Sequence, residues 1–230
     1  MKPLLLSLLI AALSGTSAVA QKDKGKELRD AVNKVSDASA AIDAIMRAKD
    51  KGIPQDLLNK AEAVVIFPSV LKAAFIIGGQ GGSGVAIKRV ANGWSAPAFL
   101  KLGGGSVGLQ IGGSKTDLIL LIMNDSGLKR LLDDKFEIGG EASVAAGLVG
   151  RTAAASTTTT LHAEILTYSR SKGLFAGVSL KGAVISHDDD RNILLYDKNA
   201  SQILGVPPVL NKDAPSGLGK LADTLATYSK

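Results

Sequence analysis

Short apolar runs separated by glycines make up most of the chain after Ala63, and they constrain its fold more than any other feature. Such runs are typical of antiparallel strands joined by hairpins. They are AVVIF, AAFIIGG, GVAIKR, PAFLKLGG, VGLQIGG, DLILLIM, FEIGG, ASVAAGLVG, LHAEILTYS and LFAGVSLKGAVI. Because glycines inside strands mark bulges, tight bends or close backbone approach, we expect a curved or barrel-like antiparallel β-sheet.

Apolar positions at three- and four-residue steps predict helices on both sides of these strands. An amphipathic helix is expected over residues 22–50, where Gly52 and Pro54 follow, and a short one over 55–62. Further short helices are expected over residues 126–133, 188–198 and 216–228. The predicted fold class is therefore α+β, with the N-terminal amphipathic helix and a few short helices packed on the curved sheet.

The first twenty residues have the layout of a cleaved secretory signal. Lys2 precedes an apolar run, and small residues at Ala18 and Ala20 fit a cleavage site before Gln21. We expect an exported chain, periplasmic or extracellular and peripheral to a membrane. The sequence has no cysteine, which excludes a lipoprotein anchor, disulfides, thiolate nucleophiles and cysteine-based metal sites.

Four segments follow from these patterns. Residues 1–20 are the expected signal peptide, 21–60 an N-terminal helical segment, 61–204 a β-rich core, and 205–230 a linker and C-terminal helix that complete the same domain. The helix over 28–46 has two interpretations, packing on the sheet or lying in a membrane interface. Its polar face mixes Asp30, Asp37 and Asp43 with Lys34 and Arg47, which favours packing over a membrane-surface role.

Two glycine motifs resemble catalytic or cofactor signatures. Gly79, Gly81 and Gly84 fit the dinucleotide pattern G-x-G-x-x-G, but that pattern works only where a strand turns into a helix. The residues that follow, VAIKRV, alternate as a strand does, so a glycine-rich hairpin is favoured. Gly104, Ser106 and Gly108 fit G-x-S-x-G, yet the next residues form a poor helix and nothing places His162 or His187 beside the serine.

The run from His187 to Asp190 leaves two alternatives open, a divalent metal site and the acidic start of a helix. Consecutive side chains rarely converge on one ion, so the helix start is favoured. We see no pair of carboxylates at a catalytic spacing. The sequence therefore predicts no enzyme, no cofactor and no metal.

Positive charge points to anionic partners. Without Lys2 the chain carries 26 basic and 21 acidic side chains, whereas aromatic residues are only 4%, which disfavours the stacking surfaces of nucleic-acid binders. Basic side chains at strand ends and turns suit phospholipid headgroups, although such charges are also commonly just solvated. The candidate lipid-binding residues are Arg151, Arg170 and Lys172, supported by Lys88, Arg89 and Lys181.

Several of these blocks together resemble the SYLF-domain family over about residues 61–204. The blocks are AEAVVIFPSVLKAAFIIGGQGGSGVAIKR, GWSAPAFLKLGGGSVGLQIGG, DLILLIMN, FEIGGEASVAAGLVGR and YSRSKGLFAGVSLKGAVI. The usual G-P-V-G-R of the family is here Gly147 to Arg151 without the proline. The resemblance implies a non-enzymatic module that binds anionic phospholipid, including phosphoinositides, and in fungal members also actin. The alternative is a structural or stress-related envelope protein that binds another protein; export makes actin binding the less favoured form of it.

Overall fold

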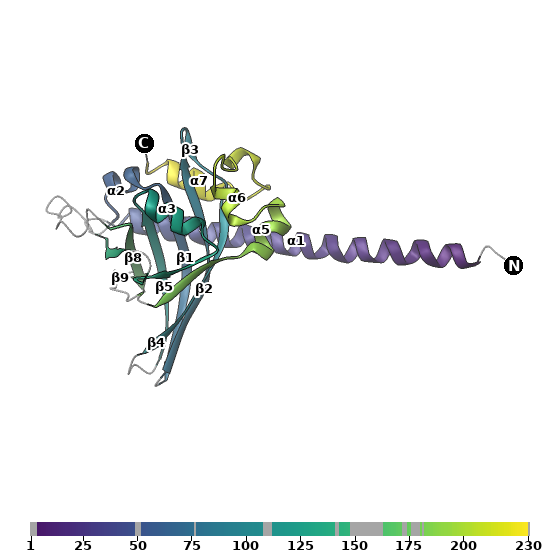
Figure 1. The fold of residues 1–230 in the computed structure, drawn as a ribbon, viewed down its shortest axis with the longest axis horizontal. Helices are drawn as coiled ribbons and strands as arrows, with labels where there is room; N and C mark the ends of the chain where they lie inside the picture. The colour runs from purple at the N-terminus through teal and green to yellow at the C-terminus, as the bar shows by residue number, and fades with distance from the viewer. Residues whose placement is uncertain are drawn as a thin grey trace.

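A curled sheet with helices on both faces forms the body of the protein (Figure 1). The computed structural model describes residues 4–48, 52–75, 77–107, 112–140, 143–147, 163–171, 174–175, 180 and 182–229. Helix α1 (Leu4–Met46) projects from the body at its N-terminal end (Figure 1). It begins at Leu4 and not near residue 22, so it includes most of the predicted signal peptide, whose cleavage remains a prediction.

The strands form one sheet in the order β6-β10-β4-β2-β1-β5-β8-β7, with β3 paired to β2 and β9 to β8. Their bounds are Ala63–Phe75 (β1), Ile77–Val90 (β2), Gly93–Trp94 (β3), Ala98–Val107 (β4), Gly112–Ile122 (β5), Lys135–Ile138 (β6), Val144–Ala146 (β7), Ile165–Ser171 (β8), Leu174–Phe175 (β9) and Ala183–His187 (β10). These pairs are antiparallel except β7 with β8, which is parallel. The predicted α+β fold with a curved sheet is confirmed; the parallel pair was not predicted.

Both faces of the sheet are buried along the first half of β1 and the strand segments beside it, which explains why these segments are apolar without interruption. In β1, Val64 and Ile66 enter one core, whereas Ala63, Val65 and Phe67 enter the other. Strand side chains alternate between faces, so a strand covered on both sides needs apolar residues at every position. The AVVIF and LILLI runs meet this requirement.

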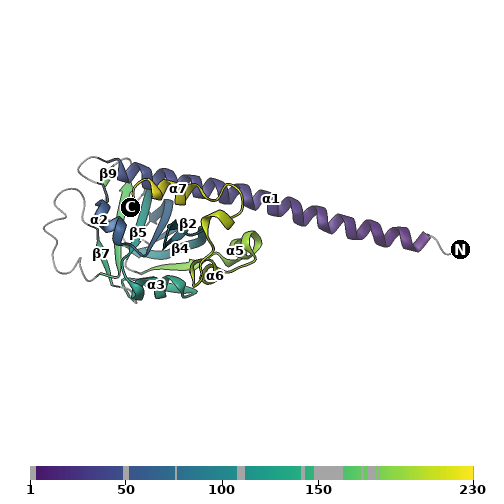
Figure 2. The ribbon, with the colours of Figure 1, turned by 90° about the horizontal axis from the view of Figure 1, so that it is seen from above.

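The helices divide between the two cores. Residues of α1, α2 (Gln55–Lys60) and α7 (Lys220–Ala226) line the first core, and α7 lies along α1 (Figure 2). Residues of α3 (Asp125–Leu132) and α6 (Ala200–Leu204) line the second. The body is thus a helix, sheet and helix sandwich in which the sheet is the middle layer.

The helix expected over residues 188–198 is shorter in the structure and is followed by a second one. Helix α5 (Asp189–Tyr196) ends where Asp197 adopts a left-handed conformation, with φ 55°. Helix α6 then begins after Asn199, whose side chain accepts a hydrogen bond from the Gln202 backbone in a capping box. A 3₁₀ turn (Asn211–Asp213) follows in the expected loop.

The apolar stripe of α1 packs onto the sheet. Ala31, Val35, Ala38, Ile42 and Ile45 are completely buried in the first core. The interpretation of this segment as core, and not as a membrane-surface helix, is therefore confirmed. Within the described residues, no helix combines the length and apolar character needed to cross a bilayer.

The dinucleotide-like glycines lie in a strand. Gly79, Gly81 and Gly84 belong to β2, which forms a hairpin with β1, so the predicted glycine-rich hairpin is confirmed. Gly104 and Ser106 of the second motif lie in β4, and Gly108 falls outside the described residues. No described helix follows Ser106 directly, so the geometry of a hydrolase elbow is absent from this part of the structure.

The strand glycines should fall into two classes when they are replaced by alanine. A Cβ on Gly84 would lie 2.4 Å from both the Ile66 carbonyl oxygen and the Phe67 ring, whereas a Cβ on Gly103 meets no atom within 4 Å. We expect Gly84→Ala to cost about 1–3 kcal/mol through overpacking, and Gly103→Ala to be neutral or stabilising by up to about 1 kcal/mol. Urea unfolding of both variants measures this difference, and equal midpoints would contradict it.

Candidate functional site: a bare glycine face

A bulge divides the central strands into an apolar half and a glycine-rich half. Pro68 and Ser69 of β1 together oppose Asp117 of β5. Ser69 has φ 56°, and its N–H donates to the Asp117 carboxylate over 3.0 Å, which closes the bulge. On the Ala63 side of the bulge the strands carry the core. On the Phe75 side, the neighbouring parts of β2 and β4 are mostly glycine.

Four glycines beyond the bulge lie together on the side of the sheet that holds α1. Gly79 pairs with Gly105 and Gly81 pairs with Gly103 in the ladder between β2 and β4. Directly paired residues, and residues two apart in a strand, point to the same face. We call Gly79, Gly81, Gly103 and Gly105 the glycine face.

Nothing in the described chain covers the glycine face closely. A Cβ on Gly103 or Gly105 would meet no atom within 4 Å, and a Cβ on Gly79 or Gly81 would meet only backbone oxygens, at 3.9 and 3.6 Å. A glycine inside a strand weakens it, and it commonly marks a place where a ligand or another backbone comes close. No described residue takes that place, so the described part of the chain leaves this face open.

Apolar and basic side chains border this face. Leu71 of β1 is 54% exposed and pairs with Gly81 on one side and with the exposed Lys115 of β5 on the other. Arg170 of β8 pairs with Asp117, two residues along β5 from Lys115. Lys115 and Arg170 are therefore diagonal neighbours on one face, with side chains roughly 7–8 Å apart. Lys115 is one of the basic residues at strand ends and turns, but it was not among the six candidate lipid-binding residues predicted from the sequence.

Two of the predicted site residues are engaged within the fold. The Lys88 ammonium donates to the Gly205 carbonyl over 3.1 Å. The Arg89 guanidinium donates to the carbonyls of Leu58 and Ala61 at the end of α2, over 2.6 and 2.9 Å. It also stacks 4.2 Å from the centre of the Trp94 ring, and burial lowers its pKa, which Glu62 partly offsets.

The remaining candidates differ in what the structure says of them. Arg170 lies in β8 at the border of the glycine face. Arg151, Lys172 and Lys181 lie outside the described residues, as does His162. Among the residues that the structure describes, Arg170 is therefore the one basic candidate from the sequence that lies at the glycine face.

The acidic start of α5 is built from ion pairs. Asp188 holds the N-cap position, but its side chain makes no capping hydrogen bond. Its carboxylate instead pairs with the Lys101 ammonium at 2.7 Å and with the Arg191 guanidinium at 3.6 Å. Asp189 and Asp190 follow in the first helical turn, where the helix dipole favours acidic residues as expected.

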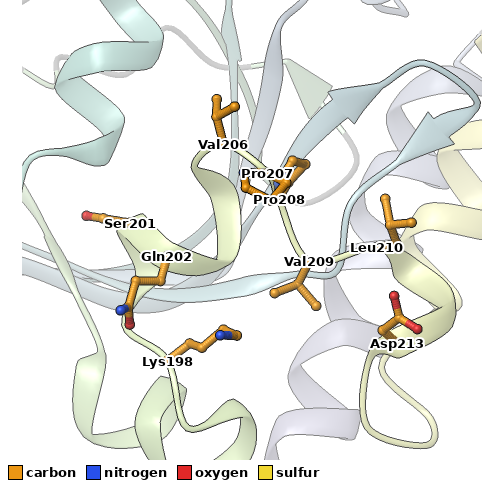
Figure 3. A pocket seen from close by; sticks show the side chains of 9 residues that line it. All are labelled: Lys198, Ser201, Gln202, Val206, Pro207, Pro208, Val209, Leu210 and Asp213. Atoms are coloured by element: carbon orange, nitrogen blue, oxygen red, sulfur yellow. The ribbon is translucent and has the colours of Figure 1, made fainter.

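A separate surface pocket of about 580 Å³ lies beside α6 (Figure 3). The loop from Val206 to Leu210 forms its apolar wall, and Lys198 and Asp213 are its charged residues. One cation and one anion cancel, so this pocket does not select for an anionic ligand. This loop lies in the linker predicted within residues 205–230, but the pocket was not predicted.

Comparison with known proteins shows the family. The family model for Ysc84, described as "Las17-binding protein actin regulator", matches residues 103–228. The chain is 36% identical over 156 residues to LAS seventeen-binding protein 3 of Saccharomyces cerevisiae, covering 66% of this chain and 34% of that protein. It is 34% identical over 149 residues to human SH3 domain-containing YSC84-like protein 1, covering 64% and 43%.

The match to Protein YSC84 of Saccharomyces cerevisiae is similar, with 36% identity over 156 residues, 66% of this chain and 33% of that protein. The chain therefore spans about a third to two fifths of the length of these relatives. More than half of the chain lies within the match to the family model. The chain belongs to the Ysc84 family, the family of SYLF domains.

Proposed function

We propose that this protein is a non-enzymatic phospholipid-binding protein of the cell envelope that holds an anionic lipid on the glycine face. The observation that carries the proposal is the open space at Gly103 and Gly105, where strand glycines have no packing reason within the described chain. The lipid phosphate would lie beside Lys115 and Arg170. Its glycerol and acyl parts would lie along Leu71 and the bare strands.

Charge sets the expected strength of this binding. Each basic residue near an anionic membrane surface contributes about 1 kcal/mol. Asp117 lies opposite Arg170 and offsets part of this charge, so Lys115 and Arg170 together provide only a modest and reversible attraction. Because that attraction is screened within about 10 Å at 0.1 M salt, binding should weaken as ionic strength rises. The predicted signal peptide supports the proposal that this activity occurs at the envelope, outside the cytoplasm.

A protein partner is the second candidate. The family is described as a Las17-binding protein and actin regulator, and one of the relatives named above is LAS seventeen-binding protein 3. In this chain Val206 is 91% exposed and Leu210 is 39% exposed, and both line the pocket beside α6 (Figure 3). Exposed apolar side chains on a proline-rich loop suit a protein contact. A chain that is exported does not meet cytoplasmic actin, so an envelope protein is the favoured partner of this kind.

Vesicle flotation tests the lipid site. We expect the protein to float with vesicles that contain phosphatidylglycerol and to remain behind with pure phosphatidylcholine. Lys115→Glu removes a positive charge and adds a negative one beside the site, so it should weaken binding about tenfold or more. Gly105→Glu places a carboxylate in open space and should weaken binding without unfolding the protein.

Lys129→Glu is the matched control because Lys129 is exposed on α3, which covers the opposite core. It makes the same change of net charge and should reduce flotation much less. Equal losses in Lys115→Glu and Lys129→Glu would reject the glycine face as the site. Failure of the unaltered protein to float with either vesicle would favour the protein partner.

A further inference from the structure

Three side chains from separate parts of the chain meet at the start of α5. Asp134 precedes β6, His187 ends β10, and Asp189 lies in the first turn of α5. Their ligand atoms lie within 4.8 Å of one another. The His187 backbone N–H donates to the Asp134 carbonyl over 3.1 Å, which extends the pairing of β10 with β6 and brings the two residues together.

The His187 ring presents a free lone pair to this group. Its Nε2 lies 2.9 Å from the Leu131 carbonyl oxygen, and since a carbonyl only accepts, Nε2 carries the proton. In the neutral ring Nδ1 is then the acceptor. The side chain is only 4% exposed, and no described residue forms a hydrogen bond with Nδ1. A buried polar atom without a partner costs free energy, so its place calls for an explanation.

The Asp189 carboxylate faces that nitrogen. Asp189 Oδ1 accepts hydrogen bonds from the Ala200 N–H over 2.9 Å and from the Asn192 amide over 3.2 Å. These bonds leave Asp189 Oδ2 directed at His187 Nδ1, 3.9 Å away, which is too far for a hydrogen bond. Asp134 is exposed and can approach from the solvent side.

The neighbouring acidic residues stay outside the group. Asp188 is occupied by Lys101 and Arg191, as described above. Asp190 is exposed and contributes no ligand atom to the group. The set assembled by the fold therefore differs from the run of consecutive residues that the sequence suggested, because Asp134 comes from another element.

We propose that Asp134, His187 and Asp189 bind a divalent first-row metal ion, with zinc as the best fit. Imidazole nitrogen and carboxylate oxygen are both zinc ligands, and three protein ligands leave the fourth tetrahedral position for water. The hydrogen bonds from His187 Nε2 and to Asp189 Oδ1 fix the orientation of both ligands, as outer contacts do in metal sites. Ligand atoms of tetrahedral zinc lie roughly 3.3 Å apart, so binding contracts the group slightly.

A metal here would join three elements that are distant in sequence. It would fix the turn before β6 to the end of β10 and the start of α5, and so add a cross-link at one edge of the fold. The site lies apart from the glycine face, and this proposal does not depend on the lipid function.

Zinc titration of the full chain, first stripped with a chelator, tests the site. We expect one zinc ion per chain by calorimetry. At free zinc about a hundredfold above Kd, the melting temperature should rise by about 5–10 °C. Asp134→Ala should weaken zinc binding at least about tenfold without changing the melting temperature of the zinc-free protein, because Asp134 is exposed.

Two further variants and one spectrum make the result specific. Asp190→Asn removes a neighbouring exposed carboxylate and should leave the zinc affinity unchanged, whereas His187→Gln should abolish zinc binding. In nitrogen NMR spectra of the ring, zinc should shift Nδ1 of His187 while the proton on Nε2 remains. Absence of zinc binding, equal affinity in Asp134→Ala, or retained binding in His187→Gln would each overturn the proposal.

Discussion

Ile42→Ala is expected to lower the free energy of unfolding by about 2–5 kcal/mol in the absence of any lipid. Ile42 is completely buried where α1 packs on the sheet, and truncation leaves a cavity that rigid strands on the other side cannot fill. Urea unfolding followed by circular dichroism measures the loss. A large effect without vesicles is expected because this part of α1 belongs to the core.

Asn33→Ala is the control for this variant, since Asn33 is exposed on the same helix. It should change stability by no more than about 0.5 kcal/mol. If Ile42→Ala were equally mild, and the loss emerged only in vesicle binding, α1 would have to leave the sheet and enter a membrane interface.

Arg89→Ala is the second large effect, with an expected loss of about 2–5 kcal/mol. The guanidinium donates to two carbonyls at the end of α2 and stacks on Trp94. Hydrogen bonds to a charged group contribute about 1.5–3 kcal/mol each, and a cation over an aromatic ring about 0.5–2 kcal/mol. These terms overlap. The variant leaves the Ala61 carbonyl without its donor, whereas the Leu58 carbonyl keeps the hydrogen bond from the Ala61 N–H. Thermal and urea unfolding give the value.

Arg89→Lys separates charge from shape. Lysine keeps the charge and one donor group but loses the planar fork. Arg89→Lys should therefore recover less than half of the stability that Arg89→Ala loses. In flotation, folded Arg89→Lys should bind vesicles as the unaltered protein does. A selective loss of lipid binding at unchanged stability would mean that Arg89 contacts headgroups and that its contacts within the fold are secondary.

Repeated local patterns made the elements predictable. The strands follow from runs such as AVVIF because burial on both faces leaves no position for a polar residue. The stripe of α1 follows from helical spacing, since Val35, Ala38 and Ile42 recur on one side. The break between α5 and α6 was missed because it depends on the conformation of the single residue Asp197.

The candidate sites could be predicted only in part, because they depend on strand order. Nothing local indicates that Arg89 reaches the end of α2, so it was taken for a free charge at a strand end. Lys115 gains its role only when β5 is placed between β1 and β8. Asp134 joins His187 only through the pairing of β6 with β10. The glycine spacing did predict that β2 and β4 contain bends or positions of close backbone approach.

The bulge at Ser69 has a consequence for how the sheet opens. On its core side, breaking the β1 ladder exposes two buried layers, so we expect those backbone amides to exchange with solvent only when the whole domain unfolds. Beyond it, the ladder between glycines is held mainly by backbone hydrogen bonds and can separate alone at a much smaller cost. One continuous strand is therefore expected to combine a half that opens only on global unfolding with a half that opens locally.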